Sequence, residues 1–111
     1  MSILDRAKSH FESKGIKEIT VPEWGDGDEP AVLFCEPITL NDQKSLRKLA
    51  DGDDFEFAVR LVIMKLVDSN GKKVFDLSDK PTLMNKVDPN VLLRVANMIA
   101  YVPSIEDSKG N

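Results

Sequence analysis

The sequence contains one cysteine, Cys35, and one histidine, His10, among its 111 residues. A single cysteine excludes an internal disulfide framework and any zinc site built from several cysteines. A catalytic histidine needs a partner acid and a nucleophile placed by the fold, and no motif here nominates them. The scarcity of both residue types predicts a protein that is not an enzyme and that uses no metal or other cofactor.

Basic residues and long apolar runs are scarce as well. The 15 lysines and arginines are outnumbered by 19 aspartates and glutamates, which gives a formal net charge of −4. A chain without a basic excess is a poor candidate for nucleic-acid binding, which depends on phosphate contacts. No apolar run reaches the ~18 residues of a membrane span, and the N-terminus lacks a signal-peptide pattern. We therefore expect a cytoplasmic protein that binds neither nucleic acid nor a membrane.

The acidic residues gather in two clusters, at 26–29 and 51–56, without the spacing of a metal site. A calcium loop needs alternating carboxylates, a glycine at position six and a glutamate at position twelve, and neither cluster has this pattern. The glycines likewise form no phosphate-binding motif. These clusters are therefore interpreted as solvated loops and helix caps.

The apolar pattern predicts a single α+β domain over residues 1–102 and a flexible tail over 103–111. In the first helix, Ile3, Ala7 and Phe11 share one face, which we expect to dock on the core. Pro22 is expected either to end the first strand or to mark it as an edge strand, and 23–30 to form a loop. The fold class is thus a mainly helical small domain with a two-stranded β element near the N-terminus. The expected helices are 2–14, 39–49, 55–67, 78–86 and 89–101, and the expected strands are 17–21 and 31–36.

Several local signals support these boundaries. Thr39 with Asp42, the pair Asp53 and Asp54, and Asp88 before a proline are placed to cap helices. Asn70 followed by glycine predicts a tight turn after the apolar run 55–67. That run has the length of a helix, although its β-branched residues leave a strand as the alternative.

Four residues are candidates for binding a partner: Trp24, Met64, Met84 and Met98. Tryptophan is highly buried on average, so Trp24 has a structural interpretation as a cover for the core edge. It also has a functional one, because tryptophan is enriched at binding hot spots. The methionines suit an adaptable surface, since methionine repacks easily, but they are also ordinary core fillers.

Two motifs and their order resemble a known family. The first is Val21-Pro22-Glu23-Trp24-Gly25, followed by a strand and by Pro37-Ile38-Thr39-Leu40. The second is Leu66-Val67-Asp68-Ser69-Asn70-Gly71-Lys72-Lys73-Val74-Phe75, which follows the apolar run. With the closing helix, the chain from about residue 17 to 102 is similar to the tail assembly chaperones of long-tailed bacteriophages, such as those of lambda and HK97. It departs from them in the longer, more acidic loop after Gly25.

The resemblance implies a protein that acts by binding other proteins. Such chaperones keep the long tape measure protein soluble, help tail tube subunits assemble around it, and are absent from the mature virion. They work in the bacterial host cytoplasm, and a homo-oligomer is compatible with this role. The alternative is a small cytoplasmic adaptor or regulatory subunit unrelated to phage.

Overall fold

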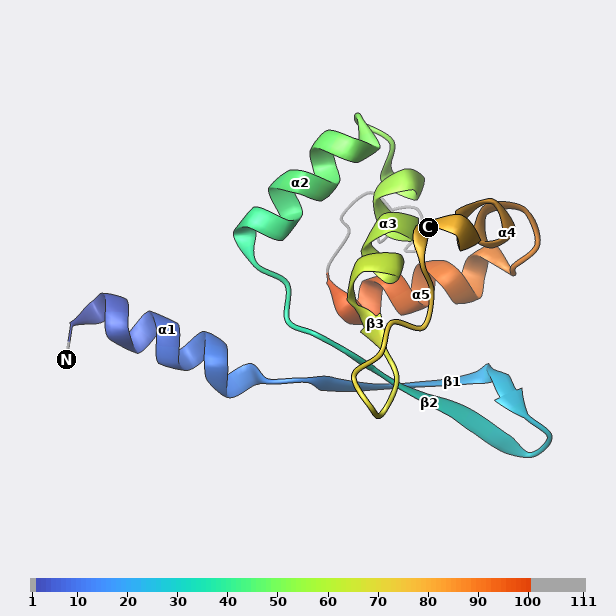
Figure 1. Ribbon diagram of the computed structural model, residues 1–111, viewed down its shortest axis with the longest axis horizontal. Helices are drawn as coiled ribbons and strands as arrows, with labels where there is room; N and C mark the ends of the chain where they lie inside the picture. Colours follow the sequence, from blue (N-terminus) through green and yellow to red (C-terminus); the bar gives the residue numbers. More distant parts are fainter. Residues whose placement is uncertain (1, 101–111) are drawn as a thin grey trace, which may run out of the picture.

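The computed structural model describes residues 2–100, which form an α+β domain with five α-helices and one three-stranded antiparallel sheet (Figure 1). The expected mainly helical α+β class is confirmed, whereas the expected two-stranded element is wrong because a third strand joins it. In chain order the elements are α1 (Ile3–Lys14), β1 (Lys17–Asp26), β2 (Glu29–Cys35), α2 (Leu40–Ala50), α3 (Asp54–Lys65), β3 (Leu66–Val67), a 3₁₀ turn (Leu77–Asp79), α4 (Lys80–Asn85) and α5 (Pro89–Ile99).

The hairpin of β1 and β2 is longer than the sequence predicted. The strands pair antiparallel from Lys17 opposite Cys35 to Asp26 opposite Glu29. The strand does not end at Pro22, and the predicted loop over 23–30 is wrong, whereas the alternative that Pro22 marks an edge strand agrees with the order β1-β2-β3. Proline is tolerated here because the pairing shifts register between Val21 and Asp26, so its missing N–H falls where the ladder is irregular. As a result Trp24 lies on a strand.

Gly25 is required by the close approach of the two strands. A Cβ atom at this position would lie 1.9 Å from the carbonyl oxygen of Glu29 and 2.7 Å from the Cα of Pro30. No side chain fits at these distances, which is the usual reason for glycine where two backbones meet. The glycine next to Trp24 therefore lets β1 continue past Pro22 and keep its partner.

The apolar run 55–67 forms a buried helix that ends two residues early. Leu66 and Val67 leave α3 and form β3, which pairs with Cys35 and Phe34 of β2. Both side chains are almost fully buried. Because their backbone bonds to β2 replace those of a further helical turn, the chain keeps its hydrogen bonds while it changes direction. The turn at Asn70 and Gly71 follows as predicted, with Gly71 at φ +81°.

Helices α2, α3 and α5 begin at the caps that the sequence predicted. Thr39 and Asp42 form a reciprocal capping box at α2. The Asp53 carboxylate accepts the N–H groups of Phe55 and Glu56 at the start of α3, and Asp88 accepts the N–H of Asn90 at α5. These caps satisfy N–H groups that have no partner within the helix.

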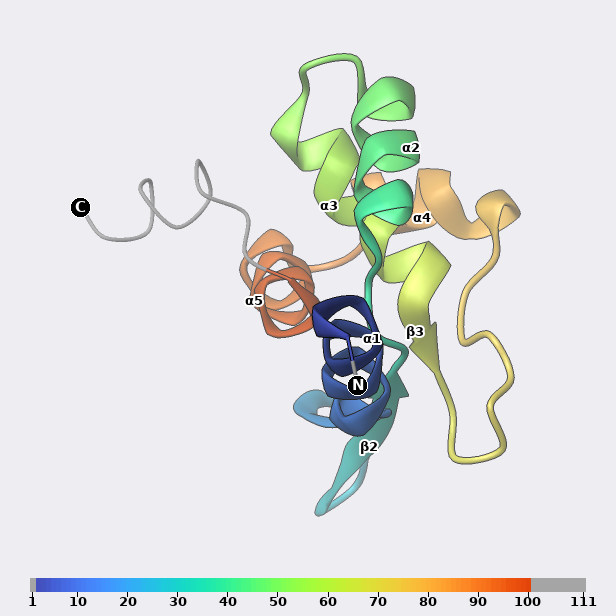
Figure 2. The same cartoon turned by 90° about the vertical axis from the view of Figure 1, so that its left-hand side faces the viewer.

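The core lies between the helices and one face of the sheet. Helix α3 contributes Leu61 and Val62, α5 contributes Val95, and β1 contributes Ile19 and Val21, all nearly inaccessible to water. Figures 1 and 2 show helices α2 to α5 gathered on one side of the hairpin. The hairpin therefore covers one side of the helices, and the turn between β1 and β2 extends beyond them.

Helix α1 contradicts the expectation that it docks on the core. None of its residues is buried, and Ile3 and Leu4 are 71% and 72% exposed. The helix precedes β1 in the chain and points away from the body of the domain (Figure 1). The radius of gyration is accordingly 15.0 Å, against about 13 Å for a compact chain of this length. The apolar stripe on α1 is real, but the straight strand that follows it carries the helix away from the core.

The predicted tail, 103–111, and the last expected helical residue, Tyr101, lie outside the described residues. Within residues 2–100, no helix is both long and apolar enough to cross a membrane. The proposed domain boundary at residue 102 thus stays a prediction.

Candidate interaction surface

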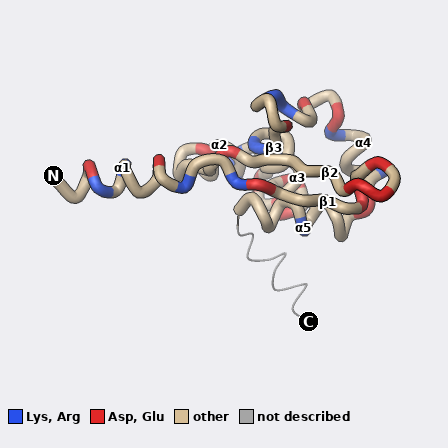
Figure 3. Tube along the Cα trace, turned by 90° about the horizontal axis from the view of Figure 1, so that it is seen from below, with Lys and Arg blue, Asp and Glu red and all other residues tan. Residues whose placement is uncertain are grey.

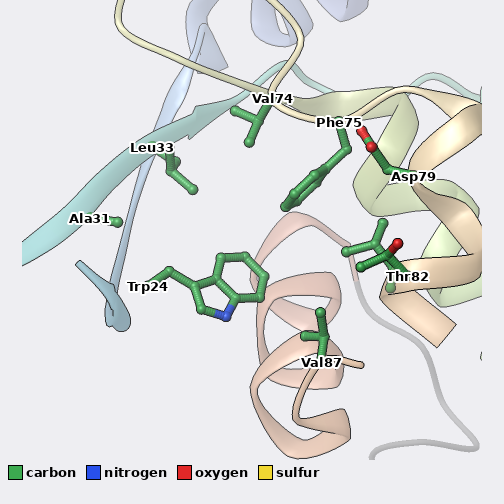
Figure 4. A pocket seen from close by; sticks show the side chains of 9 residues that line it. Trp24, Ala31, Leu33, Val74, Phe75, Asp79, Thr82 and Val87 are labelled. Carbon is green, nitrogen blue, oxygen red and sulfur yellow. The ribbon is translucent and has the colours of Figure 1, made fainter. Parts of the chain in front are cut away.

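An open, mainly apolar pocket of about 540 Å³ lies between the hairpin and the C-terminal helices. Its walls come from segments far apart in the sequence (Figure 4). The strands supply one side, the segment after β3 supplies the second, and α4 with the loop that follows it supplies the third. Seven apolar residues line what we call the Trp24 pocket: Trp24, Ala31, Leu33, Val74, Phe75, Leu83 and Val87.

The indole of Trp24 forms the centre of this pocket. The Phe75 ring meets it edge-on, with ring centroids 5.9 Å apart and planes at 90°. Such T-shaped pairs add stabilisation beyond the area they bury. Trp24 is half-buried and packs against the core cluster while it also faces the pocket. Trp24 is therefore compatible with both interpretations drawn from the sequence, as a cover for the edge of the core and as a residue that binds a partner.

An ion pair beside Trp24 fastens β1 to α5. The Arg94 guanidinium donates to both carboxylate oxygens of Glu23, with Nη1 to Oε2 at 2.9 Å. This bidentate bond holds the pKa of Glu23 at about 2, below its ordinary value of 4.5. The pair is exposed to solvent, so salt screens it and its effect is mainly on geometry. The ion pair fixes the position of Glu23, the residue that precedes Trp24 on β1.

Acidic side chains lie on the wall of the pocket and at the turn of the hairpin, which begins two residues after Trp24. Asp26, Asp28 and Glu29 lie at the turn of the hairpin, and we call them the acidic tip. Asp79 lines the pocket itself, where its carboxylate accepts the N–H of Asp76. Figure 3 shows the acidic tip at the end of the molecule opposite α1, and Figure 1 shows that it points away from α4. The pocket is therefore lined mainly by apolar side chains, with Asp79 as the one charged residue among them.

The three methionine candidates do not share one surface with Trp24. Met64 is half-buried and lines a second pocket, which shares only Phe75 with the Trp24 pocket. Met84 is exposed on α4. Met98 is half-buried on α5, and its carbonyl accepts a hydrogen bond from Lys17 at 2.6 Å. Among the described candidates, Trp24 alone lies in the Trp24 pocket, and partner binding by the methionines stays a prediction.

The sequence interpretation missed several residues of the pocket. Phe75 was named only as the end of the second motif, and Leu33 and Val87 were not singled out. Their side chains meet through tertiary contacts, so no local periodicity could place them together. The available signal was the family resemblance, because its second motif ends in Val74-Phe75.

The described residues contain no group of three or more His, Cys, Asp or Glu side chains placed to hold a metal ion. Cys35 is buried, as expected for a core thiol, and desolvation raises its pKa. A raised pKa disfavours the reactive thiolate. His10 is exposed on α1. Neither Cys35 nor His10 lines the Trp24 pocket, where the Trp24 and Phe75 rings meet.

Comparisons with family models, with characterised proteins and with solved structures give no match for this chain. The observations that bear on function are therefore the sequence motifs and the geometry of the pocket they form.

Proposed function

We propose that this chain is a tail assembly chaperone of a long-tailed bacteriophage or prophage. It binds the tape measure protein through the Trp24 pocket, keeps it soluble and helps tail tube subunits assemble around it. It acts in the bacterial host cytoplasm by protein binding, without catalysis or a cofactor, and leaves before the virion matures.

The observation that carries this proposal is the meeting of the two sequence motifs in one place. Val21-Pro22-Glu23-Trp24-Gly25 lies within β1, and Val74-Phe75 ends the second motif. Their aromatic rings contact each other and line the same pocket (Figure 4). Motifs that only stabilised separate elements would not need to meet at an open surface. Their meeting supports a shared binding role.

The shape and charge of the pocket suit an amphipathic helix. Apolar pockets bind helices through side chains spaced at i, i+3 or i+4, and i+7. Trp24 and Phe75 offer the large aromatic surface found at binding hot spots. The acidic tip and Asp79 favour a helix that carries lysine or arginine beside its apolar stripe. A tape measure segment of this kind is the client that the pocket fits.

Co-expression with the candidate tape measure protein from the same genome tests the proposal. We expect the client to become soluble and to co-purify with the wild-type chain in a defined ratio. Thr82→Arg adds a bulky cation at an exposed position on the pocket wall and should abolish co-purification. Ser45→Arg adds the same charge on the exposed surface of α2 and should leave it intact.

Two results would contradict the proposal. If the client stays insoluble with the wild-type chain, chaperone activity is refuted for the chain as it stands. If both arginine variants bind as well as the wild type, binding does not use the Trp24 pocket. A stable complex with a protein outside the tail genes would instead favour the small adaptor.

A further inference from the structure

We infer that residues 101–111 dock in a groove between helix α1 and the body of the domain, and that they hold the helix there. The groove has a volume of about 470 Å³ and lies where α1, the connection after β2 and the end of α5 meet. In Figure 1, α5 ends on the side of the body from which α1 projects. Neither the groove nor the segment depends on the identity of a client. The lining side chains that decide what fits are Phe11, Lys14, Lys17, Glu36, Ile38 and Ile99.

The segment begins at the edge of this groove. Ile99, the last residue of α5, lines the groove, and Ala100 is the last residue that the structure describes. An extended chain advances by roughly 3.3 Å per residue, so Ile105 can reach any point within roughly 20 Å of Ile99. Because the segment and the groove belong to one chain, their effective concentration is on the order of millimolar. A weak contact is therefore enough to keep the segment in place.

The groove offers apolar surface that the described residues leave uncovered. Phe11 is 36% exposed, and Ile38 and Ile99 are half-buried. Helix α1 has 12 residues and no buried side chain, and helices of about 12–15 residues or fewer are marginal alone in water. Docking of the segment buries apolar surface on both partners and stabilises the end of α1. The large apolar residues that the segment brings are Tyr101, Val102 and Ile105.

The charges of helix and segment are complementary. Helix α1 has three basic and two acidic residues, a net charge of +1, whereas residues 101–111 have two acidic and one basic, a net charge of −1. Lys14, in the last turn of α1, takes part in none of the four ion pairs found within residues 2–100. Glu106 and Asp107 directly follow Ile105, so an isoleucine seated in the groove brings two carboxylates towards Lys14. Opposite charges of this kind orient partners as they meet.

Lys17 adds a second cation where the segment begins. Its Nζ donates a hydrogen bond to the carbonyl oxygen of Met98 at 2.6 Å, which holds the ammonium group at the end of α5. Glu36 is the acidic residue of the groove lining, so two cations stand against one anion there. These groups are exposed, and salt therefore weakens their attraction for the segment.

Docking gives α1 a fixed place that its own contacts do not provide. With the segment in the groove, Phe11 is covered and α1 is held from two sides. When the segment leaves, Phe11 is uncovered and α1 stays attached to the body mainly through β1. The segment thus controls how much of α1 is accessible to other proteins.

Carbodiimide crosslinking of the purified full chain tests the contact. The reagent joins a lysine amine to an adjacent carboxylate as an amide without a spacer, so it reports close ion pairs. We expect crosslinks from Lys14 or Lys17 to Glu106 or Asp107. Lys8 on the same helix lies outside the groove lining and is the matched control, with a yield several-fold lower. In a mixture of isotope-labelled and unlabelled chains, the crosslinks should join residues of the same chain.

Hydrogen exchange supplies an independent test. Ile105→Ser removes the apolar anchor of the segment, so the backbone amides of residues 10–14 should exchange about tenfold faster than in the wild type. Leu77→Ser makes the same kind of change at a residue that is 59% exposed and lies outside the groove, and it should leave this exchange unchanged.

Three results would overturn the inference. Equal crosslink yields for Lys8 and Lys14 would show a segment that meets the helix at random, as the flexible tail expected from the sequence would. Crosslinks between labelled and unlabelled chains would mean that another copy supplies the cover. Unchanged exchange of α1 in Ile105→Ser would mean that the segment does not protect the helix. None of these results concerns client binding at the Trp24 pocket, so failure here and failure of the chaperone proposal are distinguishable.

Discussion

Replacing Trp24 with alanine measures how far this residue supports the fold. Complete burial of a large aromatic side chain makes its truncation cost about 3–5 kcal/mol. Trp24 is half-buried, which lowers this to about 2 kcal/mol, and loss of the edge-on Phe75 contact adds about 1 kcal/mol. We therefore expect Trp24→Ala to reduce the free energy of unfolding by about 3 kcal/mol. That is a large share of the ~5–15 kcal/mol typical of a small domain.

Urea unfolding followed by far-ultraviolet circular dichroism is the suitable assay, because the variant lacks the only tryptophan as a fluorophore. The melting temperature should fall by roughly 12–24 °C. Trp24→Phe, which keeps an aromatic ring, should lose about 1 kcal/mol. A double-mutant cycle with Phe75→Leu should give a coupling energy of about 1 kcal/mol.

A loss below about 0.5 kcal/mol for Trp24→Ala would refute the reasoning. It would show that the indole contributes little to the core and that the Phe75 contact carries no stabilisation. Trp24 would then act only as an anchor for a partner, which is the other interpretation that its sequence position allowed.

Three further predictions concern the hairpin and the helix caps. Gly25→Ala should lower the free energy of unfolding in urea by about 2 kcal/mol or more, because the added Cβ meets the Glu29 carbonyl. A urea midpoint equal to that of the wild type would contradict the close approach of the two strands at Gly25. Arg94→Met should return the Glu23 pKa from about 2 towards 4.5, as followed by NMR titration of the carboxyl group; an unchanged value would disprove the ion pair. Because the folded-state pKa is lowered, the pair stabilises the fold above pH ~4.5 and is lost as pH falls towards 2. Asp53→Ala should lower the free energy of unfolding by about 1 kcal/mol, measured by thermal unfolding, because α3 loses its N-terminal cap. Asp53→Asn should retain most of this stabilisation, because asparagine also caps helices.

The local features of the fold could be predicted from the sequence. The caps at Thr39, Asp53 and Asp88 are short-range patterns that need only neighbouring residues, and each begins a helix in the structure. The turn at Asn70 and Gly71 is equally local. The long apolar run forms a buried helix because nearly its whole circumference is apolar.

The errors concern features that depend on tertiary contacts. Pro22 lies inside β1 because β2 accommodates an irregular register, which the sequence of β1 alone does not show. Leu66 and Val67 leave the helix because β2 offers them a partner. The apolar stripe of α1 predicted a buried face, which is wrong because the strand that follows carries the helix away from the core. Tertiary context overrides local pattern in each of these cases.

The pocket was predictable only in part, for the same reason. Trp24 was singled out by its rarity and its setting, and it does line the pocket. Phe75, Leu33 and Val87 come to it from other segments, and their local sequences carry no common signal. Trp24 and Phe75 belong to the two motifs quoted for the family resemblance, but no contact between them was predicted from the sequence.

Site-specific photo-crosslinking at residue 82, in cells that express the complete set of tail genes, tests the central claim most directly. A photoreactive side chain at Thr82 faces the Trp24 pocket, and one at Ser45 on α2 serves as the matched control. The account predicts that position 82 crosslinks to a helical segment of the tape measure protein and that position 45 does not. Crosslinks of equal yield at both positions, or a partner at position 82 other than the tape measure protein, would contradict it.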